Sequence, residues 1–346
     1  MFFSDKSERK VIKIIKQTVV FTLLTVAGFI AMPAQAELDV ELKGSSECFR
    51  GPFANYDSWL KMLTSRGSDD ANPEQLMEKM KAFYKKEDFE RYKESLECKN
   101  FIYKVNDAMV HGYYVAPKGQ SDLPVIIHNR GGNGSYGAWV FTRAYNQLFG
   151  LAKEENVAIF ASNYRGTAPK LPGKDEFGGA DVNDVVALPQ LFKHFPNVNP
   201  EKVGVYGASR GGMQSLLAVK RGLEVDAIVL YAGQYDLFEG QKHRPKMERV
   251  HKARIPNYDE NRDEELRKRS AVFWMDEIDN DIPILLIHGD KDERVSVESS
   301  IALDKVLEKE GFTHKLSIYE GLKHRSFPKQ KEIRSEMMSW FRANWE

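Results

Sequence analysis

The chain has 346 residues, enough for one large α/β domain with an appendage or for two small domains. It carries 50 Lys and Arg against 50 Asp and Glu, so its formal net charge is zero, and no basic stripe interleaved with aromatic residues stands out. This balance argues against nucleic acid as the main partner, and the composition is that of an ordinary globular protein.

The first 36 residues have the pattern of a secretory signal peptide. Basic residues precede an apolar run over Thr18–Met32, and Pro33-Ala34-Gln35-Ala36 supplies a small-x-small cleavage pattern. The apolar run is short for a membrane span, which favours cleavage after Ala36 over the alternative of an uncleaved anchor. We therefore expect the mature protein to be periplasmic or secreted, without membrane contact after cleavage.

Two cysteines, Cys48 and Cys98, lie early in the mature chain. In an oxidising compartment such a pair is more often bridged than free, so we predict one disulfide in this segment. The alternative is two buried thiols. Neither cysteine is a candidate nucleophile, because no motif containing histidine lies near them.

The apolar pattern of residues 37–98 predicts a helical N-terminal extension. Tyr56, Trp59 and Leu60 have helical spacing, and Pro73 follows an asparagine as in the first turn of a helix. A stripe of methionines and aromatic residues continues to residue 96. Since such a stripe is usually core, we expect the extension to pack on the main domain.

From residue 99 onward, short apolar runs alternate with helical patterns. The expected strands are Phe101–Val105, Met109–Val115, Val125–His128, Val157–Ser162, Val203–Tyr206, Ala227–Tyr231, Pro283–Ile287 and His314–Tyr319, and the main helices are Tyr145–Lys153, Asp181–Phe195, Leu303–Lys309 and Glu332–Trp345. This alternation predicts an α/β domain over residues 99–346, with a mostly parallel sheet and helices on both faces. The charged stretch 234–275 is too long for a connection and predicts a lid-like insertion.

Lys202–Gly222 has the pattern of strand, Gly-x-Ser-x-Gly turn and helix, which is typical of the nucleophile elbow of the α/β-hydrolase fold. The turn is so tight that Gly207 and Gly211 must both lack a side chain. Ser209 is then exposed at a helix N-terminus, where the N–H of Arg210 points to a developing oxyanion. The alternative is a glycine-rich turn that merely contains a serine.

A serine nucleophile needs a histidine base and an acid that orients it, each on a loop after a strand. Asp292 and His324 follow the last two predicted strands and are the candidates. Asp290 and Asp236 also follow strands and remain alternatives for the acid. His288 ends a strand, and we expect it to be a packed, hydrogen-bonded residue.

The second oxyanion donor is expected in the glycine-rich loop after Val125–His128, from the backbone N–H of Arg130 or Gly131. A rival pattern overlaps this loop, because residues 132–137 match the dinucleotide motif Gly-x-Gly-x-x-Gly. The next predicted strand does not end in the acidic residue that would bind a ribose, so the pattern does not favour a dinucleotide site. No phosphate loop or zinc motif is present, and we predict neither a cofactor nor a metal.

Several segments together resemble the catalytic domain of the prolyl oligopeptidase family of serine peptidases. They are Asn163-Tyr164-Arg165-Gly166, the stretch 178–185, Gly207-Ala208-Ser209-Arg210-Gly211-Gly212 and the pattern His-Gly-x-x-Asp over 288–292. The similarity extends from Phe101 to the C-terminus and implies the triad Ser209, Asp292 and His324. Two departures stand out: residues 37–98 are too short for the family's β-propeller, and Arg130 replaces a tyrosine that assists the oxyanion hole in several members.

These patterns predict an exported serine hydrolase that acts on a small peptide or ester through an acyl-enzyme. A prolyl oligopeptidase-like peptidase for short peptides is the leading hypothesis, although a preference for proline does not follow. The alternatives are an esterase for small or carbohydrate-linked acyl groups and a non-catalytic binding module of the same fold. The sequence gives no indication of the oligomeric state.

Overall fold

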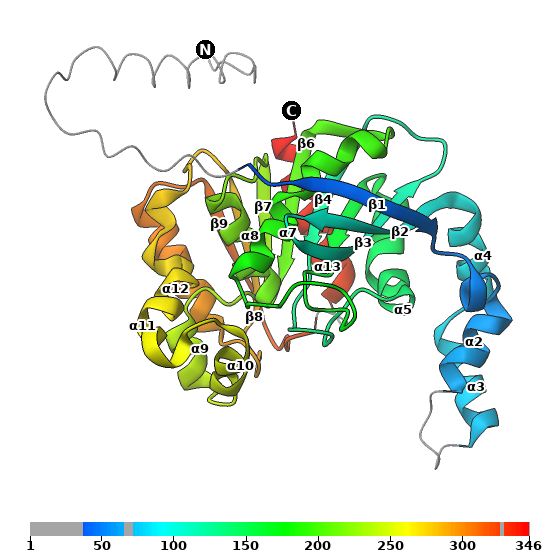
Figure 1. Ribbon diagram of the computed structural model, residues 1–346, viewed down its shortest axis with the longest axis horizontal. Helices are drawn as coiled ribbons and strands as arrows, with labels where there is room; N and C mark the ends of the chain where they lie inside the picture. The colour runs from blue at the N-terminus through cyan, green and yellow to red at the C-terminus, as the bar shows by residue number, and fades with distance from the viewer. Residues whose placement is uncertain (1–36, 66–71, 326–328, 346) are drawn as a thin grey trace, which may run out of the picture. The chain divides into compact units, whose positions relative to one another are not determined.

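The computed structural model describes residues 37–65, 72–325 and 329–345 (Figure 1). The predicted signal peptide, residues 1–36, lies outside the described residues. Leu38–Trp345 forms one compact unit. In the part of the chain that is described, no helix has the length and apolar character needed to cross a membrane.

Nine strands of the described residues form a single sheet in the order β1-β2-β3-β5-β4-β6-β7-β8-β9. Neighbours from β5 to β9 are parallel, whereas β1, β2 and β3 add an antiparallel edge. The strands are β1 (Val40–Glu47), β2 (Leu96–Val105), β3 (Ala108–Pro117), β4 (Leu123–Asn129), β5 (Ala158–Ser162), β6 (Val198–Ala208), β7 (Ala227–Tyr231), β8 (Ile284–Gly289) and β9 (His314–Tyr319). The prediction of a mostly parallel α/β fold is confirmed.

Helices cover both faces of this sheet and enclose two separate cores. The side chains of consecutive strand residues point to opposite faces, so Leu286 of β8 joins one core while Leu285 and Ile287 join the other. Helices with residues in the first core include α7 (Asn183–Val186), α8 (Arg210–Lys220) and α12 (Val297–Lys309), and those with residues in the second include α2 (Tyr56–Thr64), α4 (Lys86–Ser95), α5 (Phe141–Ala144), α6 (Gly150–Glu155) and α13 (Gln330–Asn344). Burial on both faces explains why the central strands are almost continuously apolar.

The expectation of a purely helical segment over 37–98 is wrong in its first part. It contains α2, α3 (Pro73–Phe83) and α4, but Val40–Glu47 is β1, which pairs with β2. The cause is a short two-residue alternation, since Leu38, Val40 and Leu42 pack against the first core. The expected boundary at residue 98 also falls inside β2, so this segment shares its sheet with the rest of the unit.

A disulfide joins Cys48, just after β1, to Cys98 near the start of β2. Both sulfur atoms are buried among aromatic residues of the second core. The covalent loop encloses the helices α2, α3 and α4. It therefore ties this helical segment to the antiparallel edge of the sheet.

The expected helix over 181–195 is also corrected. α7 ends at Val186, and the chain continues as a 3₁₀ segment, η5 (Leu188–His194), with Pro189 in its first turn. Proline has no N–H to donate and clashes with the carbonyl of the preceding turn, so it ends the α-helix. Leu188 and Leu191 still pack into the first core.

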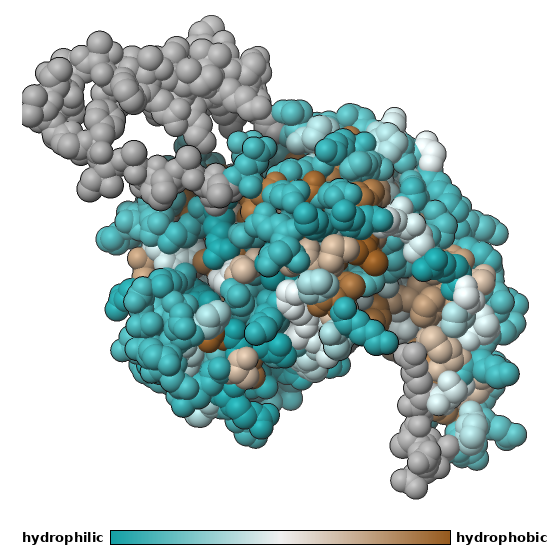
Figure 2. All heavy atoms as spheres, in the orientation of Figure 1, coloured by the Kyte–Doolittle hydropathy of each residue, from teal (hydrophilic) through white to brown (hydrophobic). Residues whose placement is uncertain are grey.

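The insertion after β7 folds into three short helices, α9 (Leu237–His243), α10 (Met247–Arg254) and α11 (Tyr258–Lys268). They lie together at the end of the sheet where the parallel strands finish (Figure 1). Hydrophilic residues cover this region in Figure 2. Leu237, Ile255, Tyr258 and Leu266 anchor the insertion in the first core.

Candidate active site

The nucleophile elbow joins β6 to α8. Ser209 has a left-handed φ of 58°, a backbone conformation that a serine adopts only where its surroundings impose it, and α8 begins at the next residue. A Cβ at Gly207 would come within 2.3 Å of the Gly211 carbonyl oxygen, and a Cβ at Gly211 within 2.1 Å of the Asn129 carbonyl oxygen. Glycine at both positions is therefore a steric requirement of the turn.

Asp292 and His324 form a hydrogen-bonded pair on the loops after β8 and β9. Nδ1 of His324 lies 2.7 Å from Oδ2 of Asp292, and Oδ1 accepts from the N–H groups of Arg294 and Val295 at 2.8 and 3.0 Å. Burial alone raises the pKa of Asp292, but the hydrogen bonds from His288 and His324 outweigh it and hold the pKa well below its usual range. The carboxylate is therefore ionised at neutral pH and fixes the orientation of the imidazole.

Ser209, Asp292 and His324 come to one edge of the sheet because β6, β8 and β9 run in the same direction. Across the described ranges, no hydrogen bond links Ser209 Oγ to His324. Catalytic hydrogen bonds of this kind often tighten only when substrate is bound. The structure thus brings the acid and the histidine into contact and places Ser209 directly after β6, at the same edge of the sheet.

The alternative candidates have other partners. Asp290 accepts a hydrogen bond from the N–H of Gly321 at 2.7 Å, and Asp236 caps α9 by accepting from the N–H groups of two residues in its first turn. His288 is fully buried between Ser300 Oγ, at 2.7 Å from Nδ1, and the Val295 carbonyl, at 3.1 Å from Nε2, and its Nε2 also lies 3.3 Å from Asp292 Oδ2. All three residues hold local structure together.

Two backbone segments flank Ser209 where an oxyanion would form. A Cβ at Gly131 would lie 3.0 Å from Ser209 Cβ and 3.5 Å from its Oγ, so the backbone at Gly131 packs directly on the serine. Arg210 is the first residue of α8, and N–H groups in the first turn of a helix have no partner inside that helix. The predicted donors Gly131 and Arg210 are therefore both adjacent to the hydroxyl.

The Arg130 side chain has a different place. Its guanidinium is buried, and Nη2 donates to the carbonyl oxygens of Asn163 and Gly134 and to Thr167 Oγ1 at 2.6, 2.9 and 2.8 Å. It joins the loop 131–137 to the loop 163–167. The guanidinium therefore supports the loop that carries Gly131 through hydrogen bonds to both loops.

A buried ionic network around Arg210 was missed by the sequence analysis. Nη2 of Arg210 lies 2.7 Å from a carboxylate oxygen of both Asp175 and Asp181, and the guanidinium carbon lies 4.5 Å from the centroid of the Phe177 ring. Asp175 also accepts from the N–H of Gly134 at 2.5 Å. The residue after the nucleophile is thus tied to the oxyanion loop. The signal in the sequence was two aspartates within a glycine-rich loop.

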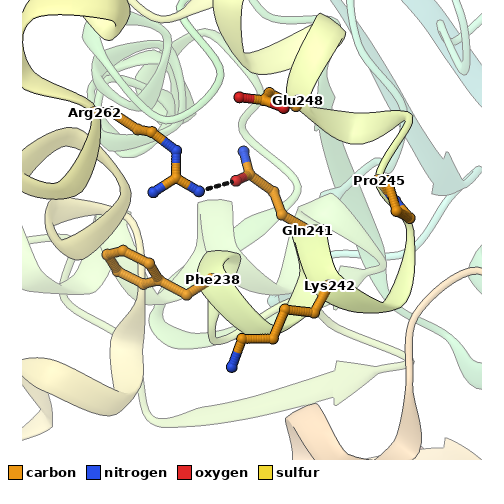
Figure 3. Close-up of a pocket in the computed structure, with 6 residues that line it drawn as sticks. All are labelled: Phe238, Gln241, Lys242, Pro245, Glu248 and Arg262. Atoms are coloured by element: carbon orange, nitrogen blue, oxygen red, sulfur yellow. Dashed lines mark hydrogen bonds between the residues drawn. The ribbon is translucent and has the colours of Figure 1, made fainter.

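A separate hollow of about 360 Å³ lies within the insertion. Figure 3 shows it between α9, α10 and α11, with Arg262 reaching to Gln241, whose oxygen accepts a hydrogen bond of 2.6 Å. Its lining residues are Phe238, Gln241, Lys242, Pro245, Glu248 and Arg262. Ser209, Asp292 and His324 are not among these lining residues.

A serine on an elbow, with a paired acid and histidine on the loops after two later strands, defines a serine hydrolase of the α/β-hydrolase fold. The model of the prolyl oligopeptidase family matches residues 141–345, more than half of the chain, and the protein belongs to this family. The family predicted from the motifs and the class of serine hydrolase are both confirmed.

Similar proteins carry the names of peptidases and esterases. The uncharacterized peptidase YtmA of Bacillus subtilis (strain 168) is 26% identical over 219 residues, which are 60% of this chain and 84% of that protein. The acylaminoacyl peptidase of Pyrococcus horikoshii has a TM-score of 0.61 and 21% identity, over 72% of this chain and 42% of that one. An acetyl xylan esterase from Paenibacillus sp. R4 has a TM-score of 0.55 and 19% identity, over 71% and 84%. At these identities the two structures show a shared fold only.

Proposed function

We propose that the protein is an exported serine peptidase that cleaves short peptides through an acyl-enzyme. The observation that carries this proposal is the strained Ser209 elbow beside the Asp292–His324 pair. A hydroxyl in this position is a nucleophile when a neighbouring imidazole removes its proton. Membership of a family of serine peptidases supports an amide as the bond that is cleaved.

In the proposed reaction, Ser209 Oγ attacks the carbonyl carbon while Nε2 of His324 takes the hydroxyl proton. The N–H groups of Arg210 and Gly131 stabilise the oxyanion, and His324 then donates the proton to the leaving amine. Asp292 keeps Nδ1 of the imidazole protonated and Nε2 free to act. Water, activated by the same histidine, then releases the acyl group from the serine.

Two features of the chain support export. Its N-terminal segment has the charge and apolar pattern of a cleaved signal peptide, with the cleavage site after Ala36. The bridge between Cys48 and Cys98 suits a protein of an oxidising compartment such as a bacterial periplasm or the outside of the cell.

An acyl esterase is the second candidate. The acetyl xylan esterase is covered over 84% of its length, whereas the acylaminoacyl peptidase is covered over 42%. The chain thus matches this esterase over more of its length than the acylaminoacyl peptidase, while the peptidase YtmA is covered over 84% as well. The same serine chemistry cleaves both ester and amide bonds.

The test is reaction of the mature protein, from Glu37, with a fluorophosphonate probe, followed by mass spectrometry of the labelled peptide. We expect labelling at Ser209 and none in Ser209→Ala, with kcat for acyl substrates about 10⁴-fold lower or more in that variant. A panel of matched esters and peptide amides then separates the two candidates by their relative kcat/KM. A folded protein that is neither labelled nor active would instead be a binding module of this fold.

A further inference from the structure

Four arginines surround the loop that carries Gly131, and we call them the mouth arginines: Arg143, Arg254, Arg294 and Arg325. Arg143 Nη1 donates to the Gly137 carbonyl at 2.7 Å, and Arg294 Nη1 donates to the Tyr136 hydroxyl at 3.2 Å. Arg254, the last residue of α10, lies against Gly134, where a Cβ would come within 2.5 Å of its Nη2. Arg325 directly follows the catalytic candidate His324.

None of the mouth arginines forms an ion pair with a carboxylate among the described residues. Other arginines do, and these are Arg91, Arg165, Arg210, Arg262, Arg269, Arg334 and Arg342. Three acidic residues close to these arginines in the sequence or at the same loops have other partners. Asp292 binds His324, Asp175 binds Arg210 and Gly134, and Glu293 lies 3.7 Å from Lys323.

The charges of three mouth arginines affect the same side chain, Tyr136. The hydrogen bond and the charge of Arg294 lower the pKa of the Tyr136 hydroxyl, and the charges of Arg325 and Arg143 lower it further. Burial lowers the pKa of the Arg143 guanidinium, and the charge of Arg325 adds to this effect. The Tyr136 side chain itself is 63% exposed, so this region is open to solvent.

We propose that the mouth arginines select acyl substrates that carry a carboxylate close to the bond that is cleaved. This inference rests on the proposed hydrolase function and adds the charge of the substrate to it. Guanidinium groups match a carboxylate in geometry and are more weakly hydrated than lysine ammonium groups. A group of them around a site also attracts anions and raises their rate of association. The carboxylate is an acidic side chain or acyl cap on one side of the bond, or a free C-terminus on the other.

Matched substrate pairs test this selection. Succinyl-Ala-Ala and acetyl-Ala-Ala coumarin amides differ in one carboxylate on the acyl side, and acetyl-Ala-Ala-Phe as acid or amide differs on the leaving side. We expect the anionic member of at least one pair to have a kcat/KM about tenfold higher in dilute buffer. Raising the ionic strength from about 0.01 to 1 M shortens the Debye length from about 30 to 3 Å and should reduce this preference.

Charge-removing variants locate the source of the preference. In Arg254→Gln and in Arg325→Gln, the ratio of kcat/KM between anionic and neutral substrates should fall about threefold each, as for one exposed ion pair. Arg342→Gln on α13 removes the same charge from an exposed arginine bonded to Glu155 and should leave the ratio unchanged. The neutral substrate reports on folding and catalysis in every variant.

Three outcomes would overturn the proposal. Equal rates for both members of each pair, with Ser209 still labelled by the probe, would refute the charge selection and leave the hydrolase function intact. A preference that persists when Arg143, Arg254, Arg294 and Arg325 are all replaced by Gln would assign it to other residues. Absence of labelling and of all hydrolysis would refute the hydrolase function and this inference together.

Discussion

The arginines near the active site fall into two sets with opposite surroundings. Arg130 and Arg210 are 1% and 4% exposed, and their guanidinium groups donate to carbonyl oxygens or to carboxylates. Arg294 and Arg325 are exposed and have no carboxylate partner among the described residues. A buried charge is tolerated only where carboxylates or hydrogen-bond acceptors surround it, whereas a charge in solvent needs no protein partner. The buried set therefore shapes the site, and the exposed set is available to a substrate.

The largest expected effect comes from the buried acid of the site. Asp292→Asn keeps the size of the side chain but cannot hold the His324 imidazole with its proton on Nδ1. We expect kcat to fall about 10⁴-fold, while the protein stays folded by circular dichroism. Asp290→Asn, two residues earlier, is the matched control and should keep most of the activity. Equal losses in both variants would show that loop structure, and not the acid, is responsible.

The second effect concerns stability and compares an arginine of the buried set with an exposed arginine elsewhere on the surface. Arg210→Met leaves the buried carboxylates of Asp175 and Asp181 without their cation, so the free energy of unfolding should fall by about 3–5 kcal/mol. Arg249→Met, at an exposed position on α10, should change it by less than about 0.5 kcal/mol. Urea denaturation measures both. A small loss in Arg210→Met would mean that the buried network contributes little to stability.

The third effect is the acid sensitivity of the buried network. Burial alone raises the pKa of Asp175, but the charge and hydrogen bonds of Arg210 and the N–H groups of Gly134 and Phe177 outweigh it and lower the pKa. The folded state therefore binds fewer protons here than the unfolded state. The stabilisation is complete above the unfolded pKa of about 4 and is lost as the pH falls below it, by about 2 kcal/mol.

The measurement for this effect is urea denaturation between neutral pH and pH 3 for the wild type and Asp175→Asn. The variant should be less stable at neutral pH and should show a shallower decline below pH 4, because it lacks the carboxylate that must be protonated. Asp259→Asn, at an exposed position, is the control and should follow the wild-type curve. A decline as steep as that of the wild type in Asp175→Asn would assign the acid sensitivity to other groups.

Much of the site followed from the sequence because its residues lie directly after strands. Ser209, Asp292 and His324 each follow a strand within a recognisable pattern, and parallel strands bring such loops to one edge. The network of Arg210 could not be found in this way. Its partners Asp175 and Asp181 lie 35 and 29 residues earlier, in a loop whose path no periodicity defines.

The errors in the fold have equally local causes. The alternation at β1 is weak, because only Val40 and Leu42 of the strand, with Leu38 just before it, pack inward, and its pairing with β2 spans a long stretch of sequence. The helical pattern over 181–195 was strong enough to suggest a helix across Pro189, but the missing N–H outweighed it. The pairing of strands that are far apart in sequence and the position of charged residues in loops depend on the whole fold, so local sequence patterns do not predict them.

Under the proposed export, the bridge between Cys48 and Cys98 would determine when this protein matures in a cell. A precursor bound for export must remain threadable through a translocation channel, and a reducing cytoplasm keeps both thiols open. The loop around α2, α3 and α4 would then close only after the proposed export of the chain. Synthesis of the chain and closure of this disulfide would thus take place in different compartments and at different times.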